Sequence, residues 1–384
     1  MASGGTGPEA LRVALVCPYS LSRPGGVQGQ VLGLARSLIR RGHEVTVCAP
    51  VDRDADVPRG VRFVDAGRSS SLRANGSVAP VALSPAGARR ALAALHDIGP
   101  DVVHVHEPFA PGLPYALLVG RGLPPLVGTF HRSGGSLLYT LLSPVTRPLA
   151  RRLALRCAVS DAAAATATHA LGGTFEVLYN GIEIDRYEAV DPWPTEGPTA
   201  LFLGRHEERK GLAVLLEAWR SVAAGRATDG PGPVLWVAGD GPASGELRAR
   251  HPESAAVRWL GVLSEEEKER RLVAADVLAA PSLGGESFGL VLLEAMAART
   301  VVVASDIDGY RQAAGGCAVL APAGDPDGLA DALSAVLDGS AATVGGDREA
   351  WVELGAARAA GWSMESLADR YEEHYRALVV GRPS

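Results

Sequence analysis

Short apolar runs alternate with amphipathic stretches twice along this chain, and this alternation limits the possible folds more than any other feature. In the first half, apolar runs at residues 12–17 and 101–106 are separated by helical patterns such as 27–41 and 85–97. A second series of the same kind begins at Thr199. Strands that alternate with helices indicate parallel sheets covered by helices on both faces. The sequence therefore predicts an α/β protein with two doubly wound, Rossmann-like domains.

The connection between the two domains is predicted after Asn180-Gly181. This dipeptide is a turn signal, and the stretch that follows it, up to Pro198, is rich in Asp, Glu and Pro. We expect an amino-terminal domain over residues 1–184 and a carboxyl-terminal domain over 185–362, with a last helix near 363–384 that packs back on the first domain. Because ligands of open α/β sheets bind at the carboxyl ends of the strands, the two domains are expected to face a central cleft.

The charge of the chain is distributed unevenly. Residues 1–180 contain 18 Arg, no Lys and 11 acidic residues, a balance of +7, whereas the remainder has 19 basic and 32 acidic residues, a balance of −13. The first half is therefore the part suited to an anionic partner, although ordinary drift in surface charge explains the difference equally well. The overall charge of −6 and the 5% aromatic content argue against nucleic acid as the main partner.

The sequence favours a cytoplasmic location. Its first ten residues, MASGGTGPEA, have neither the basic start nor the apolar stretch of a signal peptide, and no run of about 18 uncharged apolar residues occurs. The four cysteines are scattered and form no CxxC pair, which fits a reducing compartment better than a disulfide framework.

The strongest local motif is Gly284-Gly-Glu-Ser-Phe-Gly289, which leads into an apolar helix that carries Glu294. A glycine-rich turn at a helix start presents backbone N–H groups and the positive end of the helix dipole, which together form an anion site. At a rise of about 1.5 Å per residue, Glu286 and Glu294 lie roughly 12 Å apart, close to the reach from hexose to ribose in a sugar nucleotide. Carboxylates accept hydrogen bonds from vicinal hydroxyls. The alternative is a surface helix with two acids of no special role.

The same segment also matches G-x-S-x-G, the nucleophile elbow of α/β-hydrolases, with Ser287 as nucleophile and His374 downstream as a base. The elbow needs a strand that runs directly into the serine, and Pro281-Ser-Leu-Gly284 intervenes here. A serine hydrolase is therefore the least favoured alternative.

A second motif, Gly204-Arg-His-Glu-Glu-Arg-Lys-Gly211, directly follows the apolar run 200–203. Arg205 and Lys210 lie on the turn at the carboxyl end of the predicted strand. Two cations placed there can neutralise a diphosphate leaving group without help from a metal. The alternative is solvated surface charge beside the neighbouring acids.

The other motifs are less specific. The Gly25-Gly26 pair allows the backbone to approach a ligand closely, but its spacing is neither a dinucleotide fingerprint nor a P-loop. His104 and His106 share one face of a strand, and Asp306 and Asp308 form an acidic pair. Packing and turn formation explain both pairs better than a metal site does, so we predict no metal cofactor.

Taken together, these segments resemble the family four glycosyltransferases of GT-B fold over nearly the whole chain. Within that family they are most similar to the actinobacterial phosphatidylinositol mannosyltransferases, which use GDP-mannose. The segments that carry the resemblance are Val16-Cys-Pro-Tyr-Ser20, Pro24-Gly-Gly-Val-Gln28, His104-Val-His-Glu-Pro108, Thr129-Phe-His131, Gly204-Arg205 with Lys210-Gly211, and Gly284-Gly-Glu-Ser-Phe-Gly289 with Glu294-Ala-Met-Ala297. The resemblance implies a retaining reaction without a divalent metal.

The resemblance also implies residue roles. Arg205 and Lys210 would bind the donor diphosphate, and Glu294 would hold the ribose. The other implied donor contacts are Glu286 on the sugar hydroxyls, Gly26 near the phosphates, Ser287, Phe288 and Gly289. The implied catalytic residues are His131 beside the anomeric centre, Glu286, Arg205 and Lys210. The leaving phosphate itself would take the proton of the acceptor.

On the acceptor side, the resemblance implies contacts by Tyr19, Gln28, Asn75 and Arg132. Two positions depart from the mannosyltransferase pattern, because Pro80 stands where that group has an arginine and Ser136 replaces a lysine. A basic group beside the leucine-rich stretch 137–142 could contact an anionic membrane surface, namely the inner face of the plasma membrane. It consists of Arg147, Arg151, Arg152 and Arg156.

We therefore expect GDP-mannose-dependent α-mannosyl transfer to phosphatidyl-myo-inositol or a related lipid or polyol acceptor. Transfer from a UDP-sugar to a soluble acceptor is one open alternative. A non-catalytic sugar-nucleotide-binding protein is another, against which the intact cations and glutamates of the two motifs argue.

Overall fold

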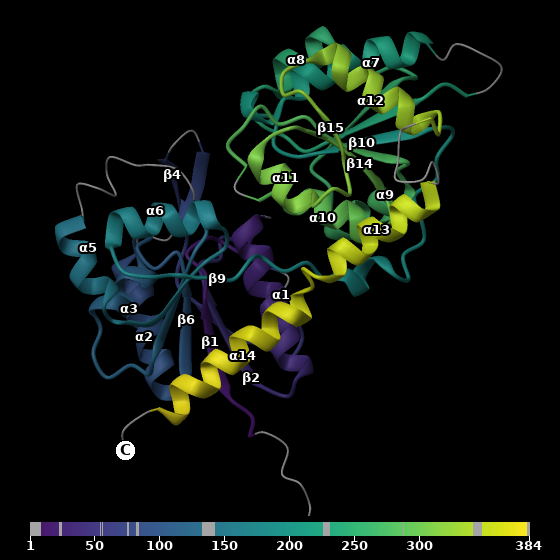
Figure 1. The fold of residues 1–384 in the computed structure, drawn as a ribbon. Helices are drawn as coiled ribbons and strands as arrows, with labels where there is room; N and C mark the ends of the chain where they lie inside the picture. The colour runs from purple at the N-terminus through teal and green to yellow at the C-terminus, as the bar shows by residue number, and fades with distance from the viewer. Residues whose placement is uncertain are drawn as a thin grey trace, which may run out of the picture. The chain divides into compact units, whose positions relative to one another are not determined.

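The computed structural model describes residues 9–22, 25–53, 55, 57–74, 77–81, 84–132, 143–225, 231–286, 288–340 and 348–381. The chain divides into two compact units. Unit 1 comprises residues 1–181 and 364–384, and unit 2 comprises residues 182–363. Each has its own parallel sheet between layers of helices, so the predicted doubly wound α/β fold is confirmed (Figure 1).

The main sheet of unit 1 contains seven parallel strands in the order β3-β2-β1-β6-β7-β8-β9. Its strands are β1 Arg12–Val16, β2 Glu44–Ala49, β3 Arg62–Asp65, β6 Val102–His106, β7 Leu126–Phe130, β8 Leu153–Ala158 and β9 Glu176–Val177. A separate antiparallel hairpin pairs β4 Ser70–Ala74 with β5 Ser77–Val81. Successive side chains of β1 point to opposite faces, and both faces are covered, so the strand is apolar and buried from Val13 to Val16.

Helices cover both faces of this sheet. The face with Val13 and Leu15 packs against α1 Gly26–Arg40 and α14 Met364–Val380. The face with Ala14 and Val16 packs against α2 Pro85–Ile98, α3 Leu113–Val119, α5 Ser143–Ala150 and α6 Asp161–Leu171. The last helix of the chain therefore lies alongside the first one, in unit 1 (Figure 1).

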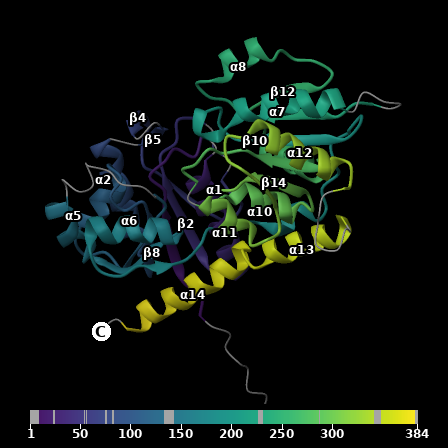
Figure 2. The same ribbon diagram turned by 45° about the horizontal axis from the view of Figure 1, so that its top comes forward.

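The sheet of unit 2 contains six parallel strands in the order β12-β11-β10-β13-β14-β15. They are β10 Thr199–Leu203, β11 Val234–Ala238, β12 Val257–Gly261, β13 Val277–Ala280, β14 Val301–Ser305 and β15 Val319–Ala321. Its helical segments are η1 Ile184–Tyr187, η2 Glu208–Lys210, α7 Leu212–Gly225, α8 Ser244–Arg250, α9 Glu265–Ala274, α10 Leu290–Ala297, α11 Asp308–Ala314, α12 Pro326–Leu337 and α13 Arg348–Ala360. Helices α7 and α12 pack together on one face, and α10 and α11 lie on the other (Figure 2).

Local signals set the ends of several helices. Ser160 caps α6 by accepting a hydrogen bond from the N–H of Ala163 at 3.1 Å. Helix α9 begins with a reciprocal capping box between Ser264 and Glu267. Both devices satisfy backbone N–H groups that have no partner inside the helix.

Among the elements that the sequence missed are strands β3, β8, β12 and β15 and helices α3, α5 and α13. Two of these strands carry an arginine in their interior, Arg156 in β8 and Arg258 in β12, which breaks the apolar pattern.

Candidate functional site

Each sheet has a topological switch point. This is the place between two neighbouring strands from which the chain builds the sheet outward in one direction on one side and in the other direction on the other side. In unit 2 this point lies between β10 and β13, and in unit 1 it lies between β1 and β6. Ligands of doubly wound sheets bind outside the carboxyl ends of the strands at such points. In unit 2 the loops that leave these ends are 204–211 and 281–289, the two motifs that the sequence singled out.

An ion-pair cluster joins these two loops. Lys210 Nζ lies 2.7 Å from Glu286 Oε1, and Arg209 Nη1 lies 2.9 Å from the same oxygen. Glu207 holds Arg205 Nε at 2.9 Å and Arg209 Nε at 3.1 Å. The cluster thus gathers three cations around two carboxylates. Sequence reasoning predicted Arg205, Lys210 and Glu286 for this place but missed Arg209, whose only signal was the run of charges in which it lies.

Backbone atoms of the two loops approach each other closely at Gly211. This residue has φ +68°, and a Cβ added to it would lie 1.9 Å from the carbonyl oxygen of Pro281. Only glycine fits this position, for both the backbone conformation and the space. This contact holds the backbone next to Lys210 against the start of the second loop.

A buried hydroxyl pair also orients Glu286. Ser282 Oγ donates to Glu286 Oε1 at 3.2 Å and lies 2.8 Å from the hydroxyl of Tyr310, whose side chain is buried. Burial, and then the charge of Glu286, raise the pKa of Tyr310, so its hydroxyl stays protonated. The sequence considered the segment before Tyr310 only as an acidic pair and missed this contact.

The glycine-rich turn leads into a helix, as predicted. Helix α10 begins at Leu290, after Gly289 at φ +95°, and no side chain among the described residues caps it. Glu286 lies in the loop before the helix, so the helical rise applies only to the part of its separation from Glu294 that begins at Leu290. Phe288 is buried and packs against Trp362, with ring centroids 4.6 Å apart, so its side chain belongs to the core. Ser287 lies outside the described residues.

Glu294, on α10, forms an ion pair with the second lysine of the chain. Lys268 Nζ lies 3.1 Å from Glu294 Oε1 and 2.9 Å from Glu265 Oε2. Burial alone would lower the pKa of Lys268, but the two carboxylates outweigh burial and raise it, so the lysine stays charged. Each of the chain's two lysines thus pairs with one of the two predicted donor glutamates. Lys268 was not predicted as a site residue.

In unit 1, a stacked histidine pair lies at the carboxyl ends of the neighbouring strands β6 and β7. His106 Nδ1 lies 2.9 Å from His131 Nε2, and the ring centroids are 5.1 Å apart. The N–H of His131 donates to Glu107 Oε1 at 2.8 Å. Burial lowers the pKa of His131 to about 3, so this imidazole is neutral at pH 7. It can exchange hydrogen bonds with a ligand but cannot supply a positive charge.

The two residue pairs considered for metal binding have other partners. His104 is fully buried, with Nδ1 at 2.6 Å from the Tyr375 hydroxyl and Nε2 at 2.7 Å from Thr129 Oγ1. Asp306 and Asp308 both pair with Arg311. In the part of the chain that the structure describes, no group of three or more His, Cys, Asp or Glu could hold a metal ion.

The predicted acceptor residues lie in different environments. Gln28 is buried, and its Nε2 donates to the carbonyl of Ser20 at 3.3 Å. Tyr19 is partly exposed and forms a β-bridge with Val81. Arg132 follows His131 in the same loop, and Asn75 lies outside the described residues. The predicted phosphate contact Gly26 begins α1, and nothing lies within 4 Å of where its Cβ would be.

Two of the four arginines in the predicted membrane-facing group instead bind the end of α6. Arg147 Nε donates to the carbonyl of Ala170 at 3.1 Å, and Arg156 Nη1 donates to that of Gly172 at 3.1 Å. Arg151 and Arg152 are exposed. The leucine-rich stretch 137–142 lies outside the described residues, and no helix among the described residues is long and apolar enough to cross a membrane.

The local geometry does not fit a nucleophile elbow. Strand β13 ends at Ala280, several residues before Ser287, whereas the elbow requires a strand that leads directly into the serine. His374, the base considered for a hydrolase, pairs with Glu176 at 2.9 Å.

Models of two glycosyltransferase families match most of the chain. The model described as Glycosyltransferase Family 4 matches residues 24–186, and the one described as Glycosyl transferases group 1 matches residues 197–339.

Characterised relatives cover nearly the whole length. The chain is 40% identical to the phosphatidyl-myo-inositol mannosyltransferase of Mycobacterium tuberculosis, over 92% of this chain and 94% of that protein. It is 41% identical to the protein of that name from Mycolicibacterium smegmatis, over 85% of each chain. The one from Propionibacterium freudenreichii is 39% identical over 78% of each chain.

Solved structures of similar fold are also glycosyltransferases. Sucrose-phosphate synthase from Thermosynechococcus elongatus superposes with a TM-score of 0.73 at 19% identity, covering 96% of this chain and 99% of that one. Anabaena HepE in complex with UDP and glucose superposes with a TM-score of 0.69 at 18% identity, covering 96% and 100%. At this level of identity the likeness concerns the fold, which is GT-B.

Proposed function

The chain belongs to glycosyltransferase family 4, and from that membership we propose that it transfers an α-mannosyl residue from GDP-mannose to phosphatidyl-myo-inositol or a related polyol lipid, with retention of configuration. Relatives named phosphatidyl-myo-inositol mannosyltransferase, about 40% identical over most of the chain, support this choice of donor and acceptor.

One observation carries the proposal. The carboxyl ends of β10 and β13 gather Lys210, Arg209 and Glu286 beside the start of α10, at the switch point of the unit 2 sheet. A diphosphate needs positive charge and backbone N–H donors, and a hexose needs a fixed carboxylate for its hydroxyls. The cations and the carboxylate lie within one ion-pair cluster, and α10 begins four residues after Glu286. We therefore place the donor there, with Arg205 and Lys210 on the diphosphate.

Two glutamates would hold the sugar portions of the donor. Glu286 is fixed by Lys210, Arg209 and Ser282, so its carboxylate is oriented before the donor binds. Glu294 is fixed by Lys268 and would accept hydrogen bonds from the ribose hydroxyls. Because both carboxylates are already held in place, less ordering entropy is lost on binding.

The reaction would break the bond between the anomeric carbon and the diphosphate oxygen and form a bond from that carbon to the acceptor oxygen. The proton of the acceptor hydroxyl would pass to the leaving phosphate on the same face. Lys210 and Arg205 would stabilise the developing charge on the diphosphate. His131 would contact the sugar as a neutral imidazole.

The acceptor would be bound by unit 1, through Tyr19, Gln28, Asn75 and Arg132. Arg151 and Arg152 are the exposed members of the basic group and would attract an anionic membrane surface. Phosphatidyl-myo-inositol is itself anionic, which fits the positive balance of residues 1–180.

The donor is tested by isothermal titration of the purified chain with GDP, GDP-mannose, UDP and UDP-glucose. We expect GDP and GDP-mannose to bind and the uridine nucleotides to bind at least tenfold more weakly. Binding of uridine nucleotides alone would overturn the mannose assignment.

Arg205→Ala should reduce turnover by roughly 10²–10³-fold, and Ser287→Ala should change it little. The reverse ranking would favour the hydrolase.

The acceptor is tested with mannose-labelled donor and vesicles that contain phosphatidyl-myo-inositol. We expect label in the lipid fraction and an α-linkage in the product by NMR. Vesicles with phosphatidylglycerol in place of the inositol lipid supply the same charge without the acceptor. Transfer only to soluble polyols would reject the lipid acceptor while leaving the donor assignment intact.

A further inference from the structure

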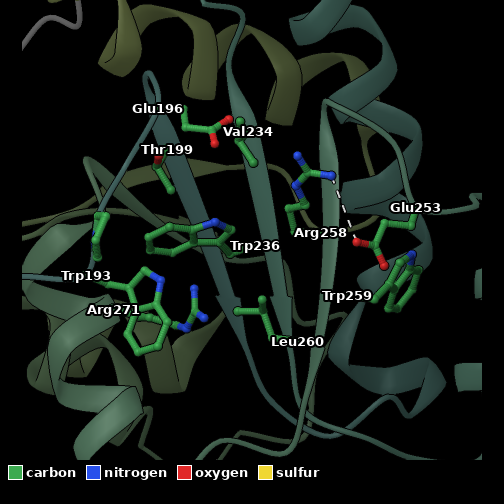
Figure 3. Close-up of a pocket in the computed structure, with 11 residues that line it drawn as sticks. Trp193, Glu196, Thr199, Val234, Trp236, Glu253, Arg258, Trp259, Leu260 and Arg271 are labelled. Carbon is green, nitrogen blue, oxygen red and sulfur yellow. Dashed lines mark ion pairs between the residues drawn. The ribbon is translucent and has the colours of Figure 1, made fainter.

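Unit 2 contains a pocket away from the two loops that carry the proposed donor residues. It is a pocket of about 230 Å³, bounded by Thr199 and Val234 at the amino ends of β10 and β11 (Figure 3). The donor residues lie at the carboxyl ends of the same sheet. The proposed glycosyl transfer makes no use of this pocket.

The floor of the pocket comes from the sheet itself. Trp236 of β11 and Arg258 of β12 are register partners whose side chains line the pocket, whereas Leu235 and Val237, the neighbours of Trp236, belong to the core of unit 2. The opposite wall comes from Trp193, in the segment before β10, and from Arg271 of α9. In Figure 3, Trp193 and Arg271 lie at one side, Arg258 at the other, and Trp236 between them.

Arg271 is the unusual member of this wall. Its side chain is 8% exposed, and its guanidinium carbon lies 4.0 Å from the centroid of the Trp193 ring and 4.7 Å from that of Trp236. Its Nε is buried and has no hydrogen-bond partner among the described residues. No carboxylate in the described part of the chain forms an ion pair with it. Burial is the main cause that lowers the pKa of Arg271, and the charge of Glu267 on the same helix opposes this only in part.

A guanidinium in this position is incompletely satisfied. Cation–π contacts with two indole rings stabilise the charge by about 1–2 kcal/mol each, but they leave the buried Nε–H without an acceptor among the described residues. A buried charge normally persists only when it is paired and hydrogen-bonded. Guanidinium groups bind phosphate and carboxylate in a planar, bidentate manner. The missing partner is therefore an anion.

The rest of the pocket limits the size and character of that partner. A volume of about 230 Å³ holds roughly seven waters, which is the space of a monosaccharide rather than of a nucleotide. Indole surfaces offer apolar walls to the C–H face of a sugar ring. The two carboxylates at the rim, Glu196 and Glu253, are exposed, and Glu253 faces Arg258 at 3.9 Å. The positive charge is thus inside and the negative charge is at the solvent edge.

We propose that this pocket binds a small anionic ligand of monosaccharide size, whose phosphate or carboxylate group pairs with Arg271 while its ring lies against the tryptophan walls. The site is separate from the donor site and adds a second ligand to the molecule. The ligand's anionic group could come from a sugar phosphate or from a sugar acid, because the guanidinium recognises both.

The test uses the full chain and follows tryptophan fluorescence and heat of binding during titration with glucose 6-phosphate, glucuronate, inorganic phosphate and glucose. Saturating GDP is present throughout, so that the donor site is occupied. We expect the two anionic sugars to bind with similar stoichiometry and glucose to bind at least tenfold more weakly. A clear preference for glucose 6-phosphate or glucuronate identifies the anionic group, and inorganic phosphate alone shows how much of the affinity is electrostatic.

Three variants link the binding to the pocket. Arg271→Met removes the charge and keeps the length of the side chain, and it should weaken binding at least tenfold. Arg271→Lys keeps the charge without the planar fork and should restore part of the affinity, which a purely structural role for Arg271 does not predict. Arg250→Met, an exposed arginine of the same unit outside the pocket, is the matched control and should bind like the parent chain.

Several results would overturn the proposal. These are the absence of binding by every anionic probe, equal binding of glucose, or unchanged affinity in Arg271→Met. If Arg271→Met does not fold, the affinities of Arg271→Lys and Trp193→Leu are compared with that of the parent chain instead. The outcome does not depend on the proposed glycosyl transfer. Titrations repeated with the Lys210→Met variant should give the same affinities, even if that variant no longer binds the donor.

Discussion

Glu286 and Glu294 are each held by one of the chain's two lysines, and these contacts decide which single residues matter most at the proposed donor site. The sequence identified both glutamates and Lys210, because glycine-rich turns and charges after a strand are local patterns. It could not pair Lys268 with Glu294, since that contact joins residues from separate helices and depends on tertiary packing. Arg209 was missed for the same reason.

The variant Lys210→Met tests how much one positive charge of the cluster contributes to turnover. Lys210 Nζ lies 2.7 Å from Glu286 and is the least exposed of the three cations in its loop. Its loss removes a charge from the diphosphate and loosens the carboxylate, so kcat/KM should fall by roughly 10²–10³-fold. Steady-state kinetics with GDP-mannose measure this. Arg220→Met, exposed on α7, is the control, and an equal loss in both variants would contradict the role of Lys210.

Gly211→Ala tests the backbone contact between the two loops. The new methyl group would lie 1.9 Å from Pro281 O at φ +68°, so the loops must move apart. We expect the free energy of unfolding of unit 2 to fall by more than about 2 kcal/mol. Urea unfolding followed by tryptophan fluorescence gives the value. Gly225→Ala, at the end of α7 with open space around it, should be neutral or slightly stabilising.

His104 gives unit 1 a predictable pH dependence. Burial lowers its pKa in the folded chain to about 3, whereas an unfolded histidine titrates near 6.5. Only the unfolded state therefore gains a proton as pH falls below about 6.5, and stability is lost by about 1.4 kcal/mol per pH unit for each such histidine. Urea unfolding by circular dichroism between pH 6.5 and 5.5 should show this slope. His104→Asn should reduce it, and the exposed His96→Asn should not.

At the level of elements, the central strands were predicted best, because buried parallel strands are continuous apolar runs that any reader of the sequence can find. The start of the last helix was also placed within one residue. Edge strand β12 was missed, because Arg258 interrupts its apolar pattern. Arg258 lines the pocket of unit 2. The residue that breaks the apolar pattern of the strand is therefore one that the proposed ligand site uses.

Helix α14 should depend on Arg41 more than on Arg40. The guanidinium of Arg41 contacts Glu365, Asp369 and Glu372, three carboxylates on one face of α14, and is 22% exposed, whereas Arg40 contacts Glu365 alone and is 48% exposed. Arg41→Met leaves three neighbouring negative charges without their shared partner. We expect the opening free energy of α14 to fall by about 1–2 kcal/mol, and Arg40→Met to change it by less than about 0.5 kcal/mol. Hydrogen exchange of α14 amides measures both, and a larger effect of Arg40→Met would reject this account.

At the level of the whole molecule, all six tryptophans lie between Trp193 and Trp362, inside unit 2. Intrinsic fluorescence therefore reports the unfolding of unit 2, whereas circular dichroism reports both units. The division is useful because each unit has its own sheet and core, and because the donor residues and the second pocket both belong to unit 2.

GDP should therefore stabilise the fluorescence-detected transition. A ligand that binds only the folded state at 100 times its Kd adds about 2.7 kcal/mol to stability, and the added free energy appears where the ligand binds. We expect the urea midpoint by fluorescence to rise with GDP, and this rise to disappear in Lys210→Met but to remain in Arg220→Met. Because fluorescence follows unit 2 alone, a rise confined to the circular dichroism signal would place the nucleotide in unit 1. That result would contradict a donor site built on Lys210, Glu286 and the start of α10.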